Sequence, residues 1–116
     1  MGVIRYQEAE AEILRNGVER RLGYTDHLMM AIVDFSNGPQ AHPDPQHSHT
    51  HEQITYVAEG EIFFILDGVP TRLAAGDMVL VPANQPHTIQ LLTEQVRLLD
   101  CFTPVREDFL KPDQQK

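Results

Sequence analysis

The sequence predicts an all-β fold, a sandwich or barrel of short strands in one domain. Two observations favour this class. From residue 54 onwards, short segments rich in Val, Ile, Phe, Tyr and Thr follow one another at even spacing, separated by turn-forming residues. The chain also has only 116 residues, enough for one buried core but not for two separate domains. We therefore expect a single domain over residues 1–116.

The first half of the chain is expected to hold two strands and a long loop. Residues 7–15, QEAEAEILR, favour either a helix that ends at Gly17 or an extended arm. VERRLGY at 18–24 and HLMMAIVDF at 27–35 are strand candidates. SNGPQAHPDP at 36–45 is rich in Gly, Pro, Asn and Asp, which predicts a loop.

In the second half, turn signals separate the expected strands, and Asp67-Gly68 is a strong hairpin turn. The other turn signals are Gly60, Gly76-Asp77, Asn84 and Pro86. Thr103 and Pro104 suit the N-cap and first position of a short C-terminal helical turn, and a polar tail follows. Segments such as FFIL and MVLV are apolar on both faces, so one face needs cover from a second sheet or a second chain. We expect a homodimer.

Composition excludes several classes of function. The net charge of −8 and the sequence pI near 5.0 disfavour a nucleic-acid ligand. Cys101 is the only cysteine, so neither a disulfide framework nor a cysteine-based zinc site is expected, and Cys101 reads as a small buried apolar residue. No apolar run suits a signal peptide or a membrane span, which favours a cytoplasmic protein without membrane contact.

The stretch HSHTHEQ at 47–53 is a candidate metal-binding segment. On a strand, His47 and His49 point the same way and can chelate one cation. If the strand stays regular, His51 and Gln53 share that face and Glu52 lies on the other. If the strand turns after His49, this alternation no longer decides between the amide and the carboxylate.

A third nitrogen ligand must come from elsewhere in the chain. His87 follows a turn built on Pro82, Asn84 and Pro86 and begins a new strand, which suits a ligand at the rim of a sheet. His27 and His42 are expected to be exposed or hydrogen-bonded instead.

These residues match a family pattern. HSHTHEQITYVAEG resembles the first cupin motif, and GDMVLVPANQPH resembles the second. The matching positions are His47, His49, Gln53 and Gly60 in the first motif, and Gly76, Pro82 and His87 in the second. Asn84 stands where the pattern prefers Gly, and Leu91 where it prefers Asn. The resemblance covers about residues 30–104 and implies a small cupin β-barrel, a jelly roll or double-stranded β-helix, with a metal at its centre.

Gln53 stands where many cupins have a glutamate, and a neutral amide leaves the divalent charge of a metal uncompensated. Such a site favours Lewis-acid work on substrate oxygens and tolerates an anionic substrate. Imidazole and oxygen ligands suit several divalent ions, so the expected cofactor is one ion of Ni, Zn, Mn, Fe or Co.

The segment VRLLDCF at 96–102 is a second candidate for function. Alternation places Leu98, Asp100 and Phe102 on one face, and a carboxylate among apolar neighbours needs a partner or a role. Arg106 can fold back over the mouth of the barrel. An ordinary Asp–Arg pair that pins the C-terminal turn is the alternative.

HSHTHEQITYVAEGEIFF, VPANQPH and LLDCFTPVREDFL together resemble the pectin-degradation cupins of the KdgF family. That family linearises 4,5-unsaturated uronates, the monosaccharide products of pectate and alginate lyases, into 4-deoxy-5-keto-uronates. The resemblance implies His47, His49, Gln53 and His87 as metal ligands, and Asp100, Phe102 and Arg106 as the catalytic set.

In that scheme Asp100 moves protons, Arg106 holds the carboxylate of a small sugar acid, and Phe102 gives the sugar an apolar wall. A cupin dioxygenase, another small-molecule isomerase or cyclase, and a non-enzymatic sugar-binding module are the alternatives.

Overall fold

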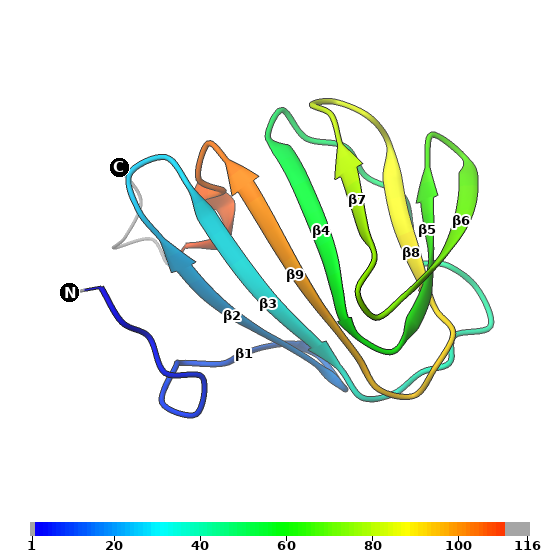
Figure 1. The fold of residues 1–116 in the computed structure, drawn as a ribbon, viewed down its shortest axis with the longest axis horizontal. Coiled ribbons are helices and arrows are strands. Elements are labelled where there is room, and N and C mark those ends of the chain that lie inside the picture. The colour runs from blue at the N-terminus through cyan, green and yellow to red at the C-terminus, as the bar shows by residue number, and fades with distance from the viewer. Residues whose placement is uncertain (1, 111–116) are drawn as a thin grey trace.

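The computed structural model describes residues 2–110, which form two antiparallel sheets facing each other (Figure 1). The larger sheet has the strand order β1-β2-β3-β9-β4-β7 and the smaller has β6-β5-β8. The strands are β1 (Glu12–Arg15), β2 (Val18–Tyr24), β3 (Met29–Phe35), β4 (Glu52–Glu59), β5 (Glu61–Leu66), β6 (Val69–Ala74), β7 (Met78–Val81), β8 (His87–Leu91) and β9 (Val96–Thr103). The all-β prediction is confirmed. The ladders form two facing sheets, a jelly roll, rather than a closed barrel.

The N-terminal segment is not a helix: residues 6–9 form a single turn, with Ala9 N–H donating to Arg5 O (2.9 Å), and an extended strand follows. Residues 12–15 form β1, which pairs with β2 through a hairpin at Gly17, where φ is 81°. Pairing with β2 therefore outweighs the helix propensity of residues 12–15, and for these residues the predicted extended arm is confirmed. The strand predicted at 18–24 is β2, and the strand predicted at 27–35 begins two residues later as β3.

The predicted loop at 36–45 has no regular strand, yet it is firmly held. Its backbone runs along the free edge of β8: Gln40 N–H donates to Leu91 O (2.9 Å) and Asp44 N–H to Ile89 O (3.0 Å). Pro39, Pro43 and Pro45 lack the N–H that a continuous ladder needs, which is why the segment reads as a loop. The consequence is that the chain arrives at His47 in a fixed register with β8.

The core lies between the two sheets. Alternate residues of β3 face inward, so Met29, Ala31 and Val33 are buried while Met30 is exposed. Ile62 and Phe64 on β5 meet them from the smaller sheet. At one end this core gives way to a cavity with both apolar and polar lining residues, described below.

The outer face of the larger sheet carries exposed apolar side chains on neighbouring strands. These are Met30 on β3, Ile54 and Tyr56 on β4, and Met78 and Leu80 on β7. Register places Ile54 opposite Leu80, and Tyr56 opposite Met78. Cys101 lies on this same outer face and is only partly buried, so its predicted full burial is wrong for the single chain. The reason is alternation: Asp100 and Phe102 take the inward positions of β9.

The C-terminal helical turn exists, but it begins later than predicted. A 3₁₀ turn spans Glu107–Phe109 with Arg106 as its N-cap, whereas Thr103 still belongs to β9. The Thr103 hydroxyl donates to His27 O (2.8 Å) instead of capping a helix. The polar tail at 111–116 lies outside the described residues. Between residues 2 and 110, no helix is long and apolar enough to cross a membrane.

Candidate active site

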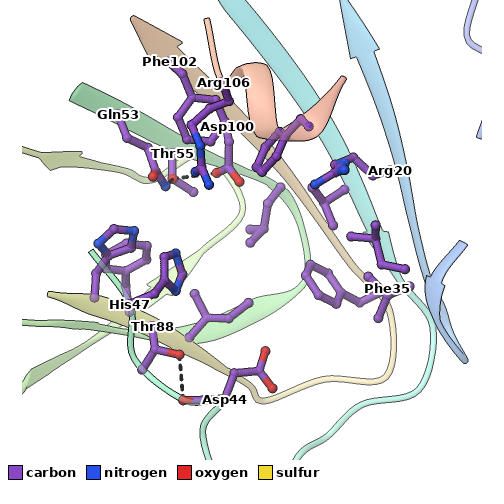
Figure 2. Close-up of a pocket in the computed structure, with 18 of the residues that line it drawn as sticks. Arg20, Phe35, Asp44, His47, Gln53, Thr55, Thr88, Asp100, Phe102 and Arg106 are labelled. Atoms are coloured by element: carbon purple, nitrogen blue, oxygen red, sulfur yellow. Dashed lines mark hydrogen bonds between the residues drawn. The ribbon is translucent and has the colours of Figure 1, made fainter. Parts of the chain in front are cut away.

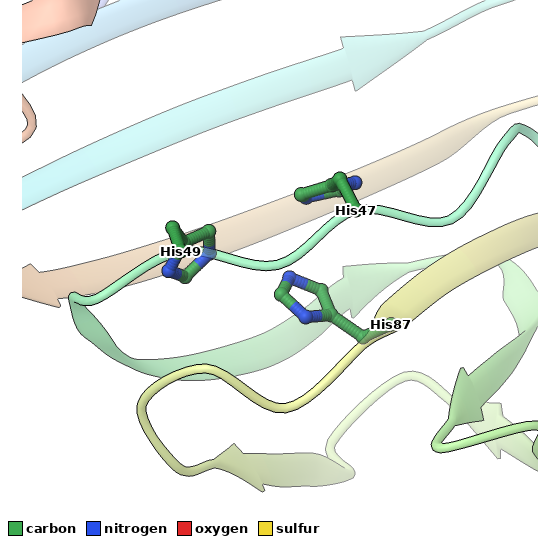
Figure 3. Close-up of side chains that lie close together, drawn as sticks. All are labelled: His47, His49 and His87. Atoms are coloured by element: carbon green, nitrogen blue, oxygen red, sulfur yellow. The ribbon is translucent and has the colours of Figure 1, made fainter.

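Three histidines converge at one end of the space between the sheets (Figure 3). One nitrogen from each of His47, His49 and His87 lies within 4.8 Å of the others. The ring centroids of His47 and His87 are 4.4 Å apart, and those of His49 and His87 are 4.9 Å apart. Three imidazoles in this arrangement can hold one metal ion.

The backbone fixes this cluster from both sides. His47 and His87 exchange both N–H···O bonds, at 3.0 and 2.9 Å, in an isolated antiparallel bridge. Asn84 N–H donates to His49 O (2.7 Å), with Asn84 in the left-handed conformation at φ 65°. Asn therefore fills the turn position where the cupin pattern prefers Gly.

Residues 48–51 do not continue a strand, so alternation from His47 fails there. β4 begins only at Glu52, and alternation within β4 then places Gln53 inward and Glu52 in solvent. The expected contrast between amide and carboxylate holds, although through β4 rather than through one strand over the whole stretch.

The nitrogens of His87 are arranged for metal binding. Nδ1 donates to Gln85 O (2.8 Å), which leaves the lone pair on Nε2. Nε2 is buried and has no hydrogen-bond partner among the described residues. Burial lowers the pKa of His87 and of His47 below the usual value, which keeps both rings neutral as metal ligands must be.

His49 and Gln53 provide a sharper test of whether a metal fits. His49 Nδ1 donates to His51 O (2.9 Å), so its Nε2 carries a lone pair, and this atom faces Gln53 Oε1 at 2.9 Å. Two acceptors at that distance repel each other, so the contact needs either a second proton on the ring or a cation beside both atoms. Two ligand atoms about 2.1 Å from one ion and at right angles to each other lie about 3 Å apart. The donor set therefore fits a bound metal ion.

The orientation of Gln53 follows from a chain of hydrogen bonds. Gln53 Nε2 donates to Thr55 Oγ1 (2.8 Å), and Thr55 Oγ1 donates to Asp100 Oδ1 (2.6 Å). Gln53 and Thr55 share the inward face of β4, and Thr55 is the register partner of Asp100 on β9. Sequence reasoning missed Thr55, although alternation from Gln53 could have found it.

Asp100 is the carboxylate that sequence alternation placed inside, and it lies there. Burial raises the pKa of Asp100 to about 6, while the hydrogen bond from Thr55 and the charge of Arg106 act in the opposite direction. A carboxyl group that titrates near neutrality can give or accept a proton during turnover.

A cavity of about 320 Å³ joins these groups (Figure 2). Its lining includes His47, His87 and Gln53, and also Asp100, Phe102 and Arg106. The structure therefore brings sequence-predicted residues of both segments to one cavity. His49 does not belong to that lining, but its Nε2 lies 2.9 Å from Gln53 Oε1.

Arg106 reaches the cavity as expected, but its partner was not predicted. Nε and Nη2 donate to the two carboxylate oxygens of Asp108, at 3.0 and 2.8 Å. The guanidinium also stacks on Phe109, with Cζ 4.2 Å from the ring centroid. The alternative, a pair between Asp100 and Arg106, does not occur among the described residues: Arg106 pairs with Asp108 instead and acts on Asp100 only through its charge. Phe102 is buried, and its ring lies edge-on to His49 at 5.8 Å.

The remaining three histidines lie outside the three-histidine cluster. The ring of His51 lies 5.6 Å from that of His49 but is not part of the three-histidine cluster, and its buried Nδ1 has no partner among the described residues. Burial is the main cause that lowers the pKa of His51. His27 and His42 are exposed, as predicted.

With this geometry in place, comparison with known proteins decides the family. The family model described as the cupin domain matches residues 35–102, more than half of the chain. The chain belongs to the cupin family. The KdgF protein of Dickeya dadantii, described as a pectin degradation protein, is 36% identical over 105 residues, covering 89% of this cupin and 93% of its relative.

Solved structures agree. KdgF from Halomonas sp. superposes with a TM-score of 0.84 at 29% identity, covering 95% of this cupin and all of that chain. An RmlC-like cupin from Shewanella frigidimarina gives a TM-score of 0.85 at 33% identity, covering 95% and 96%. The predicted resemblance to KdgF-like cupins is confirmed.

The metal site can be tested by removing one imidazole. We expect His87→Ala to lose most retained metal, because it removes the buried Nε2 that has no other partner. A metal at about 100 times its Kd should stabilise the wild type by about 2.7 kcal/mol and should leave His87→Ala nearly unchanged. Elemental analysis and thermal unfolding measure both effects. His42→Ala, an exposed histidine outside the cluster, is the control, and equal metal content in all three proteins would contradict the site.

Proposed function

We propose that this cupin is a metal-dependent enzyme that opens the ring of 4,5-unsaturated uronates to give 4-deoxy-5-keto-uronates. The observation that carries the proposal is the placement of a three-histidine cluster, a carboxyl group with a pKa of about 6 and a guanidinium around one cavity. The pectin-degradation relative and the KdgF structure support the same substrate class. We also propose that the enzyme works in the cytoplasm, where the lone Cys101 stays reduced.

The proposed metal ligands are His47, His49, His87 and the amide oxygen of Gln53. The ion is one of Ni, Zn, Mn, Fe or Co, because imidazole and oxygen donors suit all of them. A divalent ion held there would supply Lewis-acid stabilisation of negative charge on substrate oxygens.

The reaction needs two proton movements and no co-reactant. A proton leaves the anomeric hydroxyl, the bond between that carbon and the ring oxygen breaks to leave an aldehyde and an enolate, and the enolate takes a proton on carbon to become a ketone. Asp100 is mostly ionised at neutral pH and is positioned in the cavity to take the first proton and return it.

Arg106 and Phe102 hold the substrate in this scheme. Arg106 Nη1 makes none of the hydrogen bonds found between residues 2 and 110, so it can donate to a carboxylate while Nε and Nη2 stay on Asp108. Phe102 provides an apolar wall beside His49.

The direct test uses fresh monosaccharide product of a pectate or alginate lyase. Metal-loaded protein should accelerate the loss of enol-ether absorbance over a no-enzyme control, without oxygen uptake. If the rate equals the control while elemental analysis shows metal bound, the substrate assignment is wrong. Oxygen consumption would point to the dioxygenase alternative instead.

The pH profile tests the role of Asp100. A base must be ionised, so kcat/KM should fall as pH drops through about 6. Asp100→Asn should lower turnover by about 10²–10⁴-fold and remove this limb. Thr55→Val removes the hydrogen bond that lowers the pKa of Asp100, so the limb should move to higher pH. A limb that stays unchanged in Asp100→Asn would assign it to another group.

We further propose that a second copy of the chain covers the apolar outer face formed by Met30, Ile54, Tyr56, Met78 and Leu80. These side chains are continuous across neighbouring strands, and a face of this kind can pair with itself about a two-fold axis. Light scattering should give the mass of a dimer for the wild type and of a monomer for Leu80→Lys. Val69→Lys, an equally exposed apolar residue on β6, should remain dimeric. A monomeric wild type would refute the interface.

A further inference from the structure

A second guanidinium faces the same cavity from β2. Arg20 lines the wall across the cavity from His47, with Asp100 and Arg106 along the side between them (Figure 2). On the basis of the proposed function, we propose that Arg20 binds the carboxylate of the sugar-acid substrate together with Arg106, and so selects acidic over neutral sugars.

The first observation is that Arg20 is buried with unused donors. Its side chain is only 12% exposed, and Nε is buried without a hydrogen-bond partner among the described residues. The hydrogen bond found for its guanidinium runs from Nη2 to Glu12 at 3.4 Å, which is long for a charged pair. A buried guanidinium is costly unless its charge is balanced, and an anionic ligand in the cavity that Arg20 lines would balance it.

The second observation is that Arg20 and Arg106 share one platform. Arg20 Cζ lies 3.9 Å from the centroid of Phe109, and Arg106 Cζ lies 4.2 Å from the same centroid. The two carbons can be no further apart than the sum of these distances. A carboxylate has two oxygens with about four lone-pair sites, so it can accept hydrogen bonds from Arg20 while the nearby charge of Arg106 adds to its attraction.

The two arginines differ in what already holds them. Arg106 donates Nε and Nη2 to the two oxygens of Asp108, which leaves Nη1 for a ligand. Among the described residues Arg20 has no such bidentate partner, so it is the stronger candidate for the substrate. The chain carries a net charge of −8, so an anionic substrate needs concentrated positive charge where it binds, and these two residues provide it.

The position of Arg20 also sets the orientation of the ligand. The carboxylate end would lie against Phe109, and the hydroxyls of the ring would reach towards the histidines across the cavity. A neutral sugar would leave the Arg20 N–H groups unsatisfied, which is the physical basis of the selection.

Arg21 is a matched control for Arg20. It is the next residue on β2 and has a similarly buried side chain, 15% exposed, with an unpartnered buried Nε. Alternation points it to the outer face, where it contacts Tyr6 and Asp34. Loss of a buried arginine on β2 is therefore common to both variants, and only Arg20 faces the cavity.

The experiment compares Arg20→Gln, Arg20→Lys and Arg21→Gln as metal-loaded proteins. Calorimetry measures the binding of D-galacturonate and D-galactose, and kinetics on lyase product separates KM from kcat. We expect the wild type to prefer galacturonate. Arg20→Gln should weaken galacturonate binding and raise KM by about tenfold or more, with galactose binding and kcat much less affected. Arg20→Lys should be intermediate, and Arg21→Gln should match the wild type.

The outcomes distinguish the role of Arg20 from the proposed ring-opening reaction. If Arg20→Gln keeps wild-type galacturonate affinity and KM, or if the wild type binds galactose equally well, the role of Arg20 is overturned. If the wild type fails on lyase product yet prefers galacturonate through Arg20, the proposed reaction fails and the carboxylate site stands. Should Arg20→Gln not fold, Arg20→Lys keeps the charge and decides the same question.

Discussion

The hydrogen-bond chain from Gln53 through Thr55 to Asp100 is the interaction on which the site depends. Thr55 has one hydroxyl proton, and it goes to the Asp100 carboxylate. The hydroxyl must then accept from Gln53 Nε2, which turns the amide oxygen towards His49. One register pair of β4 and β9 thus sets both the direction of the amide oxygen and the environment of the carboxylate. The proposed metal ligands and the proposed base are physically coupled.

The cavity carries charges of both signs inside a chain that is acidic overall. Asp44 and Asp100 line it, and burial raises the pKa of Asp100. The amide of Gln53 adds no charge of its own. Arg20 and Arg106 line the wall of the same cavity. These two guanidiniums give a small anion a local positive charge beside the proposed metal site.

Much of the fold and the centre of the site could be predicted from sequence because their rules are local. Alternation along β9 places Asp100 and Phe102 inside, and the Asp67-Gly68 turn closes the hairpin of β5 and β6, with positive φ at both residues. The two cupin motifs pointed to His47, His49 and His87 as candidates, and the structure places these three side chains in one cluster.

The rest could not be predicted because it depends on long-range contacts. Residues 48–51 leave the strand pattern, and His47 takes its register from β8, forty positions away in the sequence, through a proline-rich segment that reads as a loop. Asp108 pairs with Arg106 because the 3₁₀ turn starts at Glu107 rather than near Thr103. Arg20 belongs to no motif, and only the packing of Phe109 reveals its position.

We propose that Gln53 and the three histidines face one metal ion because Thr55 and Asp100 orient the amide. A crystal structure of the nickel-loaded protein, with anomalous scattering at the nickel edge, tests this directly. We expect one ion about 2.0–2.3 Å from a nitrogen of each of His47, His49 and His87 and from Gln53 Oε1, with Thr55 still bridging Gln53 and Asp100. An ion bound elsewhere, or an ion on the histidines with the Gln53 amide turned away from it, would show that this coupling does not set the metal site.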